Sequence, residues 1–159
     1  MNKRLKYKEN TPERSMCEFL YAWKSEDFKK MVSLSHPTWK RFYRKPIDSI
    51  EFLFGHLKLV GGVIQSVDVS TKNSASYIIK TKLFLIDSDG VKQTRTAEWN
   101  VWYETKKFEI DLKLNAEWGV NPLSGALSLN KNNQAMLNKI RKSVQWIIDE
   151  NKSGEDKNG

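Results

Sequence analysis

The spacing of apolar residues changes along the chain. Through about the first sixty residues it has the period of helices, and three amphipathic helices are predicted. The first begins at Thr11-Pro12-Glu13, because Thr is a good N-cap, Pro suits the first helical position and an acid favours the first turn. The second begins at Ser25-Glu26-Asp27 and the third near Pro46. Gly61-Gly62 is expected to end this helical section.

From Val63 onward apolar and polar residues alternate, which is typical of half-buried antiparallel strands. Four strands are predicted, near 63–69, 77–85, 91–103 and 108–114. The predicted fold class is α+β, with N-terminal helices packed on a curved antiparallel sheet and a C-terminal amphipathic helix. The predicted segments are a basic tail (1–10), a domain (11–118), a loop (119–133), a helix (134–150) and a disordered tail (151–159).

The register of the second and third strands follows from their turn. Ser88-Asp89-Gly90 fits a three-residue hairpin loop with Gly in the left-handed position. Asp87 then pairs with Val91, which places Ile79 opposite Trp99 on the apolar side. The other side is expected to align Lys80, Glu98 and Lys113. A second hairpin is predicted at Thr105-Lys106, pairing Tyr103 with Phe108, Val101 with Ile110 and Trp99 with Leu112.

Composition narrows the class of protein. The chain has 159 residues, 39% of them hydrophobic, which fits one folded domain. No apolar run approaches the ~18 residues of a membrane span, and one Cys excludes an internal disulfide and a cysteine-based zinc site. The first eight residues are basic, without the apolar stretch of a secretory signal. We therefore expect a cytoplasmic protein, unless an N-terminal anchor has been removed.

Two segments resemble the nuclear transport factor two-like superfamily, whose members include ketosteroid isomerase-like enzymes. The run Phe19-Leu20-Tyr21-Ala22-Trp23-Lys24-Ser25-Glu26-Asp27-Phe28-Lys29-Lys30-Met31 looks like its first-helix signature. The runs Trp99-Asn100-Val101-Trp102-Tyr103-Glu104-Thr105 and Phe108-Glu109-Ile110-Asp111 look like its closing hairpin. The resemblance implies a cone-shaped roll with a pocket between its concave sheet and the helices. Some members are isomerases, dehydratases or cyclases, whereas others only bind or dimerise.

The strand pattern disfavours an enzyme of that superfamily. Its isomerases need acids that face the pocket, whereas the acids here fall on the opposite strand face: Glu98, Glu104, Glu109 and Asp111. No catalytic residue, metal site or cofactor is predicted, and His36 and His56 are assigned structural roles. The candidates for lining a ligand pocket are Tyr21, Tyr77, Trp99 and Tyr103.

Charge and aromatic residues suggest two further surfaces. The net charge is +8, and residues 1–58 carry 13 Lys and Arg against seven Asp and Glu. One basic segment suits nucleic acid or an acidic partner, unless its aromatics simply plug the open end of the cone: Trp39, Lys40, Arg41, Phe42, Tyr43, Arg44 and Lys45.

The outer sheet face carries a second set of candidates. A homodimer interface is predicted at Ile78, Phe84, Ile86 and Trp102, although the C-terminal helix could cover the same face. We expect a non-enzymatic binding or assembly domain, preferably dimeric. The alternatives are a small-molecule isomerase or dehydratase of the same fold, and a binder of nucleic acid or an acidic partner through residues 39–45.

Overall fold

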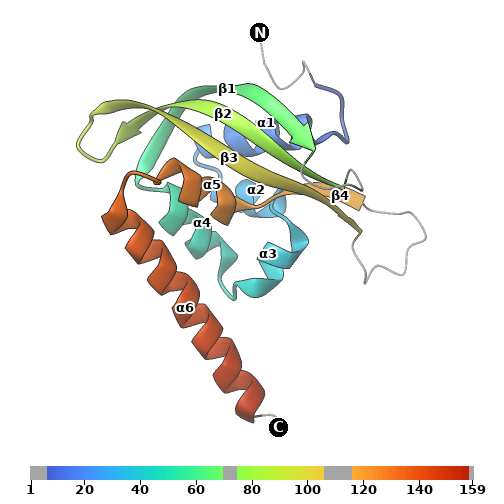
Figure 1. Cartoon of the computed structure of the whole chain (residues 1–159), viewed down its shortest axis with the longest axis vertical. Helices are drawn as coiled ribbons and strands as arrows, with labels where there is room; N and C mark the ends of the chain where they lie inside the picture. Colours follow the sequence, from blue (N-terminus) through green and yellow to red (C-terminus); the bar gives the residue numbers. More distant parts are fainter. Residues whose placement is uncertain (1–6, 70–74, 106–115, 158–159) are drawn as a thin grey trace. The chain divides into compact units, whose positions relative to one another are not determined.

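The computed structural model describes residues 7–69, 75–105 and 116–157 (Figure 1). The chain divides into two compact units, residues 1–129 and residues 130–159. The first unit is an α+β structure in which four helices precede a four-stranded antiparallel sheet of order β1-β2-β3-β4 and one helix follows it. Its helices are α1 (Pro12–Lys24), α2 (Phe28–Ser33), α3 (Pro37–Phe42), α4 (Pro46–Phe54) and α5 (Pro122–Leu129). Its strands are β1 (Leu57–Val69), β2 (Ser76–Asp87), β3 (Lys92–Thr105) and β4 (Ala116–Val120).

The helix starts follow local capping chemistry. Thr11 Oγ1 accepts a hydrogen bond from the N–H of Arg14 at 3.2 Å, which confirms the predicted start of α1. Asp27 caps α2 in the same way, with the N–H of Lys30 at 3.0 Å. No helix was predicted between the second helix and the one near Pro46, but α3 lies there, because Pro37 occupies its first turn and His36 accepts the N–H of Thr38 at 3.2 Å.

The β2–β3 register confirms the prediction from the turn. Asp87 donates its N–H to the carbonyl of Val91 at 3.0 Å, and Gly90 has φ 78°. Ile79 pairs with Trp99, and Lys80 pairs with Glu98. Glu98 is exposed, while Trp99 is fully buried on the opposite face. Lys113, expected beside Glu98, lies outside the described residues.

Two predictions about the strand boundaries are wrong. β1 begins at Leu57, and Gly61-Gly62 lies inside β1 rather than at the end of a helix. The pairing with β2 shifts between Leu59 and Gly61, as at a β-bulge. A Cβ on Gly62 would lie 2.9 Å from a methyl carbon of Leu83, so glycine permits this close strand packing.

The predicted pairing of β3 with residues 108–114 is also wrong. Tyr103 pairs with Trp118, and Val101 pairs with Val120, so β4 occupies the position assigned to that strand. Residues 108–114 lie outside the described residues. The expected loop 119–133 holds α5 instead, which covers the rest of the β3 edge. Which strands become neighbours in a sheet depends on pairing between segments that lie far apart in the sequence. The local alternation of apolar and polar residues does not specify that pairing.

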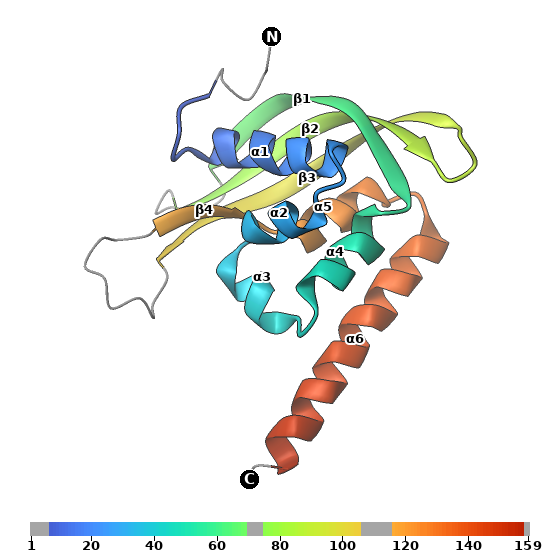
Figure 2. The ribbon, with the colours of Figure 1, turned by 180° about the vertical axis from the view of Figure 1, so that it is seen from behind.

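One face of the sheet, here called the inner face, packs against α1 (Figure 2). Four aromatic rings form the centre of this core: Phe19, Trp23, Phe54 and Trp99, each at most 1% exposed. The Trp23 indole also donates a hydrogen bond to the carbonyl of Leu57 at 3.1 Å, which joins α1 to the start of β1. We call the opposite face of the sheet the outer face.

The second unit contains α6 (Gln134–Lys157). The helix begins at the predicted residue but continues past residue 150 through most of the segment that was expected to be disordered. Asn133 caps it, with its Oδ1 accepting the N–H of Met136 at 3.1 Å. Trp146 is 63% exposed on this helix.

Candidate functional site

The centre of the inner face is a packed cluster of aromatic and aliphatic side chains around Trp99. Phe54 stacks on Trp99 with ring centroids 5.8 Å apart, and Phe19 meets the same indole edge-on at 5.4 Å. Val101 and Ile79 beside Trp99 are fully buried. Tight aromatic packing of this kind stabilises a core and occupies the volume that a substrate would need.

The buried hydroxyl of Thr81, at the centre of the inner face, already has hydrogen-bond partners within the chain. Thr81 is fully buried, and its hydroxyl accepts a hydrogen bond from the Trp99 indole at 2.9 Å. The same hydroxyl donates to the carbonyl of Ala97 at 3.3 Å. Both bonds hold β2 to β3, so Thr81 has a structural role rather than a role toward a ligand.

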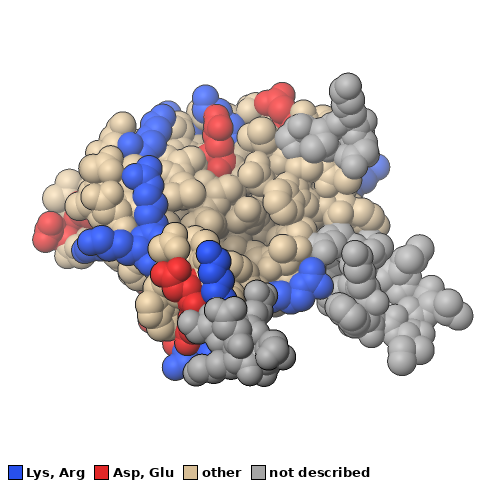
Figure 3. Space-filling model, turned by 60° about the horizontal axis from the view of Figure 1, so that its bottom comes forward, with Lys and Arg blue, Asp and Glu red and all other residues tan. Residues whose placement is uncertain are grey.

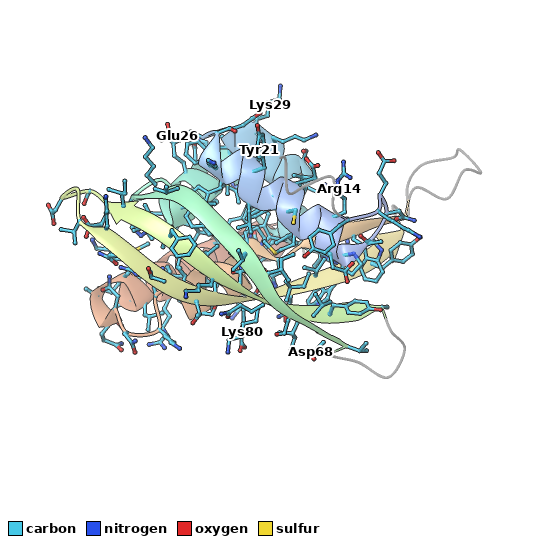
Figure 4. All side chains as sticks on the ribbon, turned by 90° about the horizontal axis from the view of Figure 1, so that it is seen from above. Arg14, Tyr21, Glu26, Lys29, Asp68 and Lys80 are labelled. Carbon is cyan, nitrogen blue, oxygen red and sulfur yellow. The ribbon has the colours of Figure 1, made fainter. Side chains whose placement is uncertain are left out.

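The four candidates for lining a pocket do not converge. Trp99 belongs to the core, and Tyr21 is 43% exposed on the side of α1 away from the sheet (Figure 4). Tyr77 and Tyr103 do come together, around Trp118, with ring centroids 5.2 Å and 4.9 Å from that indole. Trp118 was missed because it lies in a five-residue strand within the expected boundary between domain and loop.

Two of the three aromatic side chains of the basic segment are buried, and Phe42 is half-buried. Trp39 and Tyr43 are each 6% exposed, with ring centroids 4.6 Å apart. Burial raises the pKa of Tyr43. These buried rings offer no open face on which a base could stack.

The charged side chains of this segment stay at the surface. Arg41, Arg44 and Lys45 are exposed, and Lys40 is half-buried. Over the molecular face drawn in Figure 3, Lys and Arg side chains are spread out, with Asp and Glu side chains among them. Two of the segment's three aromatic rings are therefore buried, whereas three of its four cations are exposed.

The outer face carries exposed apolar side chains on β1 and β2. Val60 is 46% exposed, Val63 38% and Phe84 41%, and we call these three residues the outer patch. Their strands place Gly61 opposite Phe84 and Val63 opposite Lys82. The predicted interface residues Ile78 and Ile86 are half-buried on the same face. Trp102, the fourth predicted interface residue, is half-buried and covered by the His36 ring at 4.7 Å.

Lysines surround the outer patch. Lys58 and Lys92 both pair with Ile86, next to Phe84, and the Lys82 ammonium lies 5.9 Å from the centre of the Phe84 ring. Figure 4 shows Lys80 and Asp68 pointing away from α1 on this same side of the sheet. The outer face therefore combines apolar and charged groups, as contact surfaces between proteins do.

The outer strand β1 is the least buried part of the sheet. Only Leu57 and Leu59 are buried along it, and no residue from Val60 to Val69 is. Val69 at its end is 54% exposed, and Ile64 and Val67 on the inner face are half-buried. The prediction of one regular alternation from Val63 to Val69 is wrong, because the irregularity between Ile64 and Ser66 places Val63 on the outer face and Val67 and Val69 on the inner face.

Comparison of the chain with models of protein families, with curated proteins and with solved structures finds no match. Among the described residues, no helix is long and apolar enough to cross a membrane. The same part of the chain contains no group of three or more His, Cys, Asp or Glu side chains arranged to hold a metal ion.

Proposed function

We propose that this chain is a non-enzymatic assembly domain with the cone-shaped roll of the nuclear transport factor two-like superfamily, and that it forms a homodimer. One contrast carries the proposal. The inner face, where enzymes of that superfamily hold a substrate, is filled by the rings around Trp99, whereas apolar side chains are exposed on β1 and on the outer face beside it. Exposed apolar surface of this kind marks a site of contact with another macromolecule.

The experiment is sedimentation velocity over a range of about 1–100 µM protein, near the dissociation constants of moderate dimers. The unmodified chain is expected to sediment above its monomer mass as the concentration rises. Val63→Lys adds a charge to the outer patch and is expected to shift the protein toward monomer. Val91→Lys is the matched control, because Val91 is 54% exposed in the β2–β3 turn, away from the patch.

Circular dichroism of both variants checks that the fold is kept. An unmodified chain that remains monomeric throughout the range would overturn the dimer. Equal behaviour of Val63→Lys and Val91→Lys would show that association uses a different surface.

A further inference from the structure

On the other side of the sheet, the chain covers part of the edge formed by β4 and β3. Beyond β4, His36 donates its N–H to the carbonyl of Val120 at 2.8 Å, and Val120 donates to Leu34 at 3.0 Å. Where β4 ends, α5 takes over along β3. Ser124 accepts the backbone N–H of Asn100 at 3.0 Å, and Ser128 accepts that of Glu98 at 2.8 Å. These contacts satisfy groups that an exposed edge would present to another strand.

β1 has no such cover. It is the outermost of the described strands, and it runs for 13 residues on the far side of β2 (Figures 1 and 2). The Trp23 indole uses the carbonyl of Leu57 at one end. From Val60 to Val69 the described residues place no strand, helix or side-chain cap on the open side. A long edge with exposed valines is a template for pairing with another strand.

We propose, building on the homodimer inferred above, that β1 pairs antiparallel with β1 of a second copy, with Val63 at the two-fold axis. This register is the one in which all 13 residues of β1 find a partner. It also keeps the faces matched: Val63 faces its counterpart on the outer face, and on the inner face Leu57 faces Val69 and Leu59 faces Val67 of the second copy. Since paired side chains must share a face, a one-residue slip would set apolar against polar positions.

Charge complementarity supports the same register. Lys58 and Asp68 are both exposed on the outer face of β1, five residues on either side of Val63. In the proposed dimer, Lys58 of each copy therefore lies opposite Asp68 of the other, and the symmetry produces two such pairs. The two irregularities of β1, at Leu59/Gly61 and Ile64/Ser66, also fall opposite one another.

Cysteine cross-linking tests the two-fold position. In a Cys17→Ser background, Val63→Cys is expected to give a disulfide-linked dimer on mild oxidation, because directly paired Cα atoms lie about 4.5–5.5 Å apart. Val60→Cys is the matched control on the same strand, since its two copies would be about 20 Å apart at ~3.3 Å per residue. Cross-linking of Val60→Cys as efficiently as Val63→Cys would overturn the register.

A charge exchange gives a second readout that does not depend on oxidation. Lys58→Asp and Asp68→Lys are each expected to weaken dimerisation about tenfold, and the double variant to restore it to within about threefold. Lys29→Asp, an equal charge change at an exposed position of α2 on the other side of the sheet, is expected to have little effect. If the unmodified chain is a dimer but shows neither Val63 cross-linking nor charge rescue, β1 pairing is wrong while the assembly function stands. A monomer in sedimentation overturns both.

Discussion

The hydroxyl of Ser128 makes the hydrogen bonds to the backbone of Glu98 that a neighbouring strand would otherwise make. It accepts the N–H of Glu98 at 2.8 Å and lies 3.1 Å from the carbonyl oxygen of the same residue, to which it can donate. One turn earlier on α5, Ser124 accepts the N–H of Asn100 at 3.0 Å. Two serines at i and i+4 thus continue the hydrogen bonding of β3 where β4 ends.

Removal of the Ser128 hydroxyl is expected to loosen the β3 edge locally. Ser128→Ala leaves the N–H of Glu98 without this acceptor, and a typical net hydrogen bond contributes about 0.5–1.5 kcal/mol. The Glu98 amide is then expected to exchange with deuterium up to about tenfold faster, while the amide of Ile79 keeps its protection. Ser124→Ala should move the effect to the Asn100 amide. Unchanged exchange at Glu98 would show that the Ser128 contact does not protect the strand.

Gly125 lies between these serines for a steric reason. A Cβ at this position would lie 2.1 Å from Cε3 and Cζ3 of Trp99. In Gly125→Ala, the higher helix propensity of Ala stabilises α5 by about 1 kcal/mol. The new methyl group must, however, displace a fully buried indole, and overpacking of this kind typically costs about 1–3 kcal/mol. We therefore expect a net loss in the free energy of unfolding, measured by urea denaturation.

Gly61→Ala is the control for this substitution. A Cβ on Gly61 would lie 3.8 Å from the Phe84 ring, which is an ordinary contact. Its free energy of unfolding is expected to stay within ~0.5 kcal/mol of the unmodified protein. A Gly125→Ala variant as stable as Gly61→Ala would indicate that Trp99 can move without cost.

Sequence patterns predicted those parts of the fold that short-range chemistry determines. The β2–β3 register followed from Gly90 and from the matching of apolar faces, and the start of α1 followed from Thr11 and Pro12. The start of β1 was missed because Leu57 continues the helical spacing of Leu53 and Phe54. Over those few residues the apolar positions fit a helix as well as a strand, and only Gly55 marks the end of α4.

Long-range contacts explain what local patterns did not predict. The composition of α5 suggests a loop, yet its glycine packs against Trp99, and its two serines bind residues of β3 that lie 24 and 30 positions earlier in the sequence. Trp118 reaches Tyr77 only through the pairing of three strands. The candidate ligand residues failed to converge for a related reason: strand parity predicts which face a tyrosine occupies, but not whether neighbouring rings fill that face.

The hydroxyl of Thr81 is expected to stabilise the fold, because it accepts the hydrogen bond of the buried Trp99 indole. Thr81→Val keeps the volume but leaves the buried Nε1 donor of Trp99 without its acceptor, which costs about 1–3 kcal/mol in the free energy of unfolding. Thr81→Ser retains the acceptor and loses only a methyl group. The measurement is nuclear magnetic resonance of the indole N–H of Trp99, which should lose exchange protection in the Val variant and keep it in the Ser variant. Equal protection in both would contradict the role of this hydrogen bond.

The β2–β3 turn is expected to make stability depend on pH through Asp87. Its carboxylate accepts the backbone N–H groups of Val91 and Asp89, both at 2.9 Å, and the side-chain amide of Gln93. The Val91 hydrogen bond is the largest cause that lowers the pKa of Asp87; slight desolvation opposes it, and the Asp89 and Gln93 bonds and the charge of Arg95 lower it further. A lowered pKa in the folded state means that the carboxylate stabilises the fold above the unfolded pKa, roughly 3.9, and that this contribution is lost as the pH falls through the folded value.

Asp87→Ala is therefore expected to lower the melting temperature at pH 6, and the difference from the unmodified protein should shrink as the pH falls from about 4 toward 2. Asp87→Asn is the matched variant, because its amide oxygen can still accept the two backbone N–H groups without a charge. Its melting temperature should lie between the other two at pH 6 and approach that of the unmodified protein in acid, where the carboxyl is also neutral. Thermal denaturation followed by circular dichroism measures all three, and a difference for Asp87→Ala that grows on acidification would contradict the stabilising role of the ionised carboxylate.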